Sequence, residues 1–130
     1  MNLWPSLWLV MAGGAVGAGL RFLIGAWLLR QLGSGFPWGT FAVNVLGSFA
    51  AGLLLAWLQR PEAAPWLRPL LMTGLLGGLT TWSALMVDCL VLWRELERPG
   101  LALSYLALTF ACGLAAVLLG LLLGQGLRGG

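Results

Sequence analysis

Charged residues are scarce in this sequence. Of its 130 residues only 8% are charged, 60% are apolar, and the mean hydropathy is +0.94. Soluble domains carry roughly a quarter charged residues, so the composition excludes a water-soluble protein. Histidine and lysine are absent, and the two cysteines, Cys89 and Cys112, have no second Cys or His at ligand spacing. The sequence therefore predicts free thiols, and it offers no metal cluster or nucleophile–base pair from which an enzyme could be built.

Long apolar runs make up most of the chain. They predict four membrane-spanning helices, at about Leu7–Leu29, Trp38–Leu58, Leu67–Trp93 and Leu101–Gly124, because a span needs about 20 apolar residues. The first run has no basic residue before it and continues past Arg21, so we interpret it as a retained helix and not as a signal peptide. We expect an all-α membrane protein in which residues 1–130 form a single four-helix transmembrane domain.

Small and aromatic residues support this arrangement. Most tryptophans lie near the predicted helix ends, where their amphipathic rings suit the interfaces of a lipid bilayer. Glycines spaced four apart let helix backbones approach closely. Three such pairs predict close helix packing: Gly13/Gly17, Gly74/Gly78 and Gly120/Gly124.

The arginines indicate how the chain is oriented in the membrane. The net charge of +3 would favour nucleic-acid binding in a soluble protein, but here the arginines are scattered over every loop, so we interpret them as contacts with lipid headgroups. Four spans place three arginines on each side of the membrane: Arg60, Arg68 and Arg128 against Arg30, Arg94 and Arg98. Because orientation follows the difference in basic residues, the chain should insert both ways. It could then pair with an inverted copy about an axis in the membrane plane.

Polar side chains form stripes on two predicted helices. Thr40, Asn44 and Ser48 are spaced four apart on the second helix, and Tyr105 and Thr109 on the fourth, so each set shares one face. Polar groups inside a bilayer mark candidate sites. These groups either donate to a ligand or bond to neighbouring helices and their own i−4 carbonyls, and the sequence leaves both interpretations open.

The residue types in the spans favour an anion. Besides the stripes, the spans hold one guanidinium, Arg21, and one acid, Asp88, near the end of the third helix. Hydroxyl, amide and guanidinium groups all donate hydrogen bonds, whereas a proton-coupled exporter of cations needs a carboxylate near the membrane centre. We therefore expect a path for a small, strongly hydrated anion. Arg21 contributes to that path, or it snorkels or pairs with Asp88.

Adjacent glycines interrupt the third apolar run. Gly77 and Gly78 precede Thr80 and Thr81, and such a pair favours an unwound turn near the middle of the helix, whose carbonyls lose their helical partners. Carbonyls at membrane depth must be buried in protein or bind an ion. Two inverted copies meeting here would gather two carbonyls from each chain, which suits a monovalent cation such as Na+. The alternative is a kinked helix whose threonines bond back to the backbone.

Three motifs carry a family resemblance: GGAVGAGLR (13–21), GTFAVNVLGSF (39–49) and GLLGGLTTWS (74–83). On these motifs the chain resembles the Fluc (CrcB) fluoride channels. The resemblance implies an antiparallel, dual-topology homodimer with two pathways, which passively lets fluoride leave the cytoplasm through a bacterial or archaeal inner membrane and so reduces its toxicity. It also implies a structural Na+ that is not transported, held at the dimer centre by the backbone carbonyls of Gly77 and Thr80.

The stripes and the resemblance together give a predicted fluoride pathway, formed by Asn44, Trp82, Ser83, Tyr105, Thr109, Thr40, Ser48 and Arg21. The family usually has two phenylalanines in the third helix whose ring edges face the anion, and Trp82 and Leu85 stand at those positions here. Trp82 keeps an aromatic edge, but Leu85 has none. One alternative is therefore a non-conducting partner subunit of a paralogous channel. Another is a small multidrug-resistance type exporter, which the missing carboxylate in the first helix disfavours.

Overall fold

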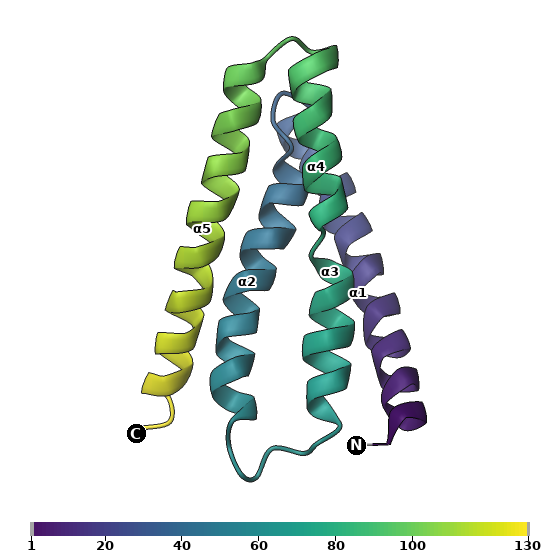
Figure 1. Cartoon of the computed structure of the whole chain (residues 1–130), viewed down its shortest axis with the longest axis vertical. Helices are drawn as coiled ribbons and strands as arrows, with labels where there is room; N and C mark the ends of the chain where they lie inside the picture. The colour runs from purple at the N-terminus through teal and green to yellow at the C-terminus, as the bar shows by residue number, and fades with distance from the viewer. Residues whose placement is uncertain (1, 130) are drawn as a thin grey trace.

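The computed structural model describes residues 2–129 and contains only helices and connecting loops over that range (Figure 1). The helices are α1 (Leu3–Leu32), α2 (Trp38–Leu58), η1 (Arg68–Leu76), α3 (Gly77–Leu79), α4 (Trp82–Leu90), η2 (Val91–Glu95) and α5 (Pro99–Gly126). The segments η1 and η2 are π-helical and therefore more widely wound than an α-helix. Four stretches are long and apolar enough to cross a membrane, the third being Arg68–Glu95. The expected all-α architecture with four spans is confirmed.

The helices begin and end at residues that favour helix termini, and these residues do not always coincide with the ends of the apolar runs. α2 has the predicted bounds, beginning directly after Pro37. α1 and α5 extend a few residues beyond their apolar runs. α1 stops at Gly33, whose φ of 76° suits a glycine cap, and α5 starts with Pro99, which is favoured in a first helical turn.

Two pairs of helices pack backbone against backbone, α1 with η1 and α3, and α2 with α5 (Figure 1). A Cβ atom placed on Gly17 would collide with the carbonyl of Leu75, and one on Gly52 with the carbonyl of Val117. Gly120 approaches α2 in the same way. The expected role of the small-residue pairs is therefore confirmed, although Gly52 was not among the predicted pairs.

One cluster of buried side chains lies near the turn between η2 and α5. Leu85, Leu92, Ala102 and Tyr105 form this cluster. The two helix pairs diverge toward the other end of the molecule, where α1 begins and α5 ends (Figure 1). Large apolar side chains cover the outward faces, among them Phe22, which is 75% exposed. Such an apolar exterior is that of a protein surrounded by lipid.

Two extended residues separate α3 from α4. Thr80 (φ −82°, ψ 153°) and Thr81 (φ −149°, ψ 119°) have left the helical conformation. The extended residues therefore lie within the segment 77–83 in which the sequence predicts an unwound turn, while Gly77 and Gly78 themselves remain helical. The Thr81 hydroxyl caps α4 by accepting a hydrogen bond from the Ala84 amide at 3.2 Å, which satisfies one donor at the start of the new helix.

Candidate functional site

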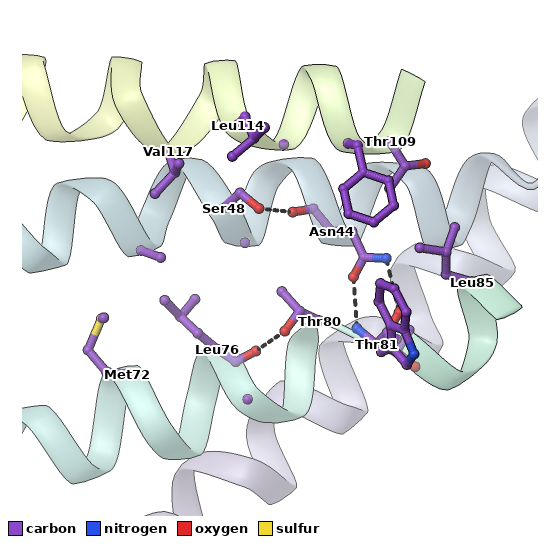
Figure 2. A pocket seen from close by; sticks show the side chains of 16 residues that line it. Asn44, Ser48, Met72, Leu76, Thr80, Thr81, Leu85, Thr109, Leu114 and Val117 are labelled. Atoms are coloured by element: carbon purple, nitrogen blue, oxygen red, sulfur yellow. Dashed lines mark hydrogen bonds between the residues drawn. The ribbon is translucent and has the colours of Figure 1, made fainter. Parts of the chain in front are cut away.

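A cavity of about 530 Å³ lies between the diverging helix pairs. Its walls come from α2, η1, α3, α4, α5 and the extended residues between α3 and α4 (Figure 2). The polar side chains are hydroxyls and one amide, and among residues 2–129 no carboxylate contributes to the wall. The lining side chains that matter for the site are Asn44, Ser48, Thr80, Thr81, Trp82, Leu85, Thr109 and Phe110.

Asn44 joins α2 to the extended segment. Its side-chain Nδ2 donates to the Thr81 carbonyl at 3.0 Å, and its Oδ1 accepts from the Thr81 amide at 2.7 Å (Figure 2). One carboxamide thus replaces the backbone partners that Thr81 loses by leaving the helix. Because an amide NH2 group has two donors, one N–H of Asn44 remains for another acceptor.

Three of the four hydroxyls in the cavity bond back to their own helices, the exception being that of Thr81. Ser48 donates to the Asn44 carbonyl at 2.7 Å, Thr80 to the Leu76 carbonyl at 2.8 Å, and Thr109 to its i−4 carbonyl at 2.8 Å. This is the second of the two interpretations that the sequence left open. A hydroxyl has one O–H, so each of these side chains must rotate before it can donate to an anion.

A second cavity, of about 360 Å³, holds three further polar groups of the spans. Arg21, Thr40 and Asp88 line it. The proposed pairing of Arg21 with Asp88 is wrong within the described range, because Arg21 Nε donates to the Gly78 carbonyl at 3.0 Å and Asp88 accepts from the Tyr105 hydroxyl at 3.0 Å. Arg21 therefore ties α1 to α3.

Thr81 lies at the partition between the two cavities, since it lines both. Two predicted pathway residues lie outside them. Tyr105 is fully buried in the apolar cluster, and Ser83 is exposed, with its Oγ 3.4 Å from Thr81 Oγ1. The stripe predicted on the fourth span thus divides, because Thr109 faces the cavity whereas the Tyr105 hydroxyl is held by Asp88.

The extended segment also frees two backbone carbonyls. In a continuous helix the Gly77 carbonyl would accept from the Thr81 amide and the Thr80 carbonyl from the Ala84 amide. The Thr81 amide instead donates to Asn44, and the Ala84 amide donates to the Thr81 hydroxyl. These are the two carbonyls that the resemblance assigned to a bound cation, and their lost donors fit that role.

Phe110 was not predicted from the sequence, and Leu85 was named only as standing where the family has a phenylalanine that faces the anion. Leu85 lines the cavity but is only 3% exposed, because it packs into the apolar cluster. Phe110 lines the cavity from α5 and forms an edge contact with Trp82. Phe110 follows Thr109 directly and lies three residues before Gly113, which also lines the cavity. That spacing was the signal that could have identified it.

These features define a polytopic membrane protein whose interior cavity is lined by polar groups without a carboxylate. The family model described as "CrcB-like protein, Camphor Resistance (CrcB)" matches residues 8–121. The chain belongs to this CrcB family.

Three relatives illustrate the match, and each is named "Fluoride-specific ion channel FluC". The protein from Xylella fastidiosa (strain M23) is 56% identical over 122 residues, covering 93% of this chain and 91% of the relative. The one from Xanthomonas euvesicatoria pv. vesicatoria (strain 85-10) is 53% identical over 123 residues, covering 94% and 92%. The one from Agrobacterium fabrum (strain C58 / ATCC 33970) is 44% identical over 122 residues, covering 92% and 95%. The relatives are named as ion channels, so the family is not one of enzymes.

Proposed function

We propose that this chain is a fluoride-selective channel that passively lets fluoride leave the cytoplasm through the inner membrane of a bacterium or archaeon. The observation that carries the proposal is the cavity wall formed by Asn44, Ser48, Thr81 and Thr109, which offers hydrogen-bonding groups and no carboxylate. Such a wall can replace part of an anion's water shell and gives a cation no charged partner. The names of the relatives support fluoride as the ion.

Purified protein in liposomes should release fluoride at least about tenfold faster than chloride, because a barrier difference of ~1.4 kcal/mol between the two ions is enough for that ratio. An ion-selective electrode follows each halide after the membrane potential is collapsed with a potassium ionophore. Protein-free liposomes are the control. If fluoride stays inside while a co-reconstituted paralogue conducts, the alternative of a non-conducting partner subunit is favoured. Proton-driven uptake of a quaternary ammonium would favour the exporter.

The pathway also needs a second copy, since a single chain leaves the cavity open between its diverging helix pairs. We propose an antiparallel homodimer in which the Gly77 and Thr80 carbonyls of both copies hold a structural Na+. Two observations support it: both carbonyls have lost their helical donors, and the arginines are balanced across the membrane. The ion would neutralise carbonyl oxygens that otherwise face one another at membrane depth.

Radioactive Na+ should bind to the purified protein with a stoichiometry of one ion per two chains, because each ion needs carbonyls from both copies. Equilibrium dialysis measures this ratio, and replacing Na+ with the larger N-methylglucamine should remove the binding and lower the dimer fraction. One Na+ for each chain, or dimers whose crosslinked cysteines require parallel packing, would contradict the arrangement.

A further inference from the structure

The cavity holds few groups of positive polarity that are free to meet an anion. The hydroxyls of Ser48, Thr80 and Thr109 donate to backbone carbonyls, and one N–H of Asn44 is bound to Thr81. What the wall still offers is the second N–H of Asn44, the O–H of Thr81, the indole N–H of Trp82 and the edges of aromatic rings. An aromatic edge carries the positive part of the ring quadrupole, so it attracts an anion without any hydrogen bond.

Two aromatic rings from different helices meet in this wall. Trp82, the first residue of α4, and Phe110, in the middle of α5, both line the cavity. Their ring centroids are 6.0 Å apart and their planes make an angle of 75°. In such an edge-to-face pair one ring gives an edge to its neighbour, and the other ring keeps its perimeter free. Both side chains remain accessible, Trp82 at 63% and Phe110 at 48%.

Leu85, which lines the same cavity, cannot supply such an edge. Leu85 is buried against Leu92, Ala102 and Tyr105, so its side chain is part of the apolar cluster and presents only aliphatic atoms. Phe110, by contrast, directly follows Thr109 and is therefore held beside the polar groups of the wall by the rigid α5 helix.

We propose that Phe110 determines anion specificity in this cavity. Its ring is held against Trp82 and presents a positively polarised edge to a small dehydrated halide. Three nearby hydroxyls are already bound to backbone carbonyls. The assignment rests on the proposed channel function and adds to it a residue from α5. The edge attracts any anion and repels cations, so discrimination among anions depends on how closely each one approaches the ring.

The test replaces Phe110 with pentafluorophenylalanine, which keeps the shape of the ring and inverts its quadrupole. Fluoride efflux from liposomes should fall by about tenfold, corresponding to the loss of one favourable aromatic edge contact, and the ratio of fluoride to chloride efflux should fall with it. Phe110→Leu should slow fluoride to a similar degree. A residue that only packs would tolerate the fluorinated ring, since its volume is nearly unchanged.

Phe22 provides the matched control, because it lies on α1, is 75% exposed and lines none of the described cavities. Pentafluorophenylalanine or leucine at position 22 should leave efflux within about twofold of the unmodified protein. Unchanged efflux with the fluorinated ring at position 110, or equal losses at positions 22 and 110, overturns the role of Phe110 while the channel function stands. An unmodified protein that releases no fluoride overturns both.

Discussion

Asn44→Ala is expected to reduce fluoride efflux by well over tenfold and to lower the stability of the protein. The substitution leaves the amide and the carbonyl of Thr81 without the partners that they have at 2.7 and 3.0 Å. An unsatisfied buried polar group costs about 1–3 kcal/mol, and two groups are orphaned at once. Efflux from liposomes and the temperature at which the detergent-solubilised protein loses its elution peak measure the two effects.

Ser48→Ala is the control for this result, because Ser48 lies one turn further along the same face of α2 and lines the same cavity. Its hydroxyl donates only to the carbonyl of its own helix, and removing it leaves that carbonyl with its helical partner. We expect stability close to wild type and a smaller loss of efflux. Asn44→Asp is a second variant, since it keeps the acceptor for the Thr81 amide and loses the donor. Equal efflux in Asn44→Ala and Ser48→Ala would contradict the role given to the carboxamide.

Gly17→Ala should separate α1 from the third span. The added methyl group would collide with the Leu75 carbonyl and come within 2.8 Å of the Leu79 amide. Both atoms belong to backbone that cannot turn aside as a side chain can, so the helices must move apart. Overpacking of this kind costs roughly 1–3 kcal/mol. The shift should also lengthen the hydrogen bond between Arg21 and the Gly78 carbonyl, so efflux should fall together with the thermal stability.

Gly19→Ala is the matched substitution two residues further along α1. A Cβ atom there meets nothing within 4 Å, and alanine is favoured over glycine in a helix by up to about 1 kcal/mol. We expect thermal stability equal to wild type or slightly higher. If both variants unfold at the same temperature, the backbone contact at Gly17 does not hold these helices together.

The helices could be predicted from the sequence because their signals are local. The bounds of α2 depend on Pro37 and on the polar turn after Leu58, and the predicted and observed bounds agree. The glycines that pack helix against helix were predicted for the same reason, since their spacing is visible along one segment. The placing of Asn44 and Ser48 on one face of α2 also follows from helical periodicity, whereas Tyr105 and Thr109, predicted as one stripe, lie in different surroundings.

The details of the site could not be predicted because they depend on partners distant in the sequence. The adjacent glycines indicated an unwound turn in the segment 77–83 but not its exact residues, because the extended conformation is stabilised where the Asn44 carboxamide, 37 residues away, meets Thr81. In the same way the sequence left open whether Arg21 contributes to the path, snorkels or pairs with Asp88, whereas its side chain donates to a backbone carbonyl 57 residues along the chain. Neither of these long-range contacts can be deduced from local sequence patterns.

The hydrogen bonds between Asn44 and Thr81 also bear on how the chain is assembled during synthesis. The third span cannot satisfy its own backbone, so it would be costly to release into lipid alone. The helix that completes it is the one translated just before, and its carboxamide is already in place when the later segment leaves the translocation machinery. Because α2 precedes the third span in the chain, the backbone groups of Thr81 need not enter the lipid without a hydrogen-bond partner.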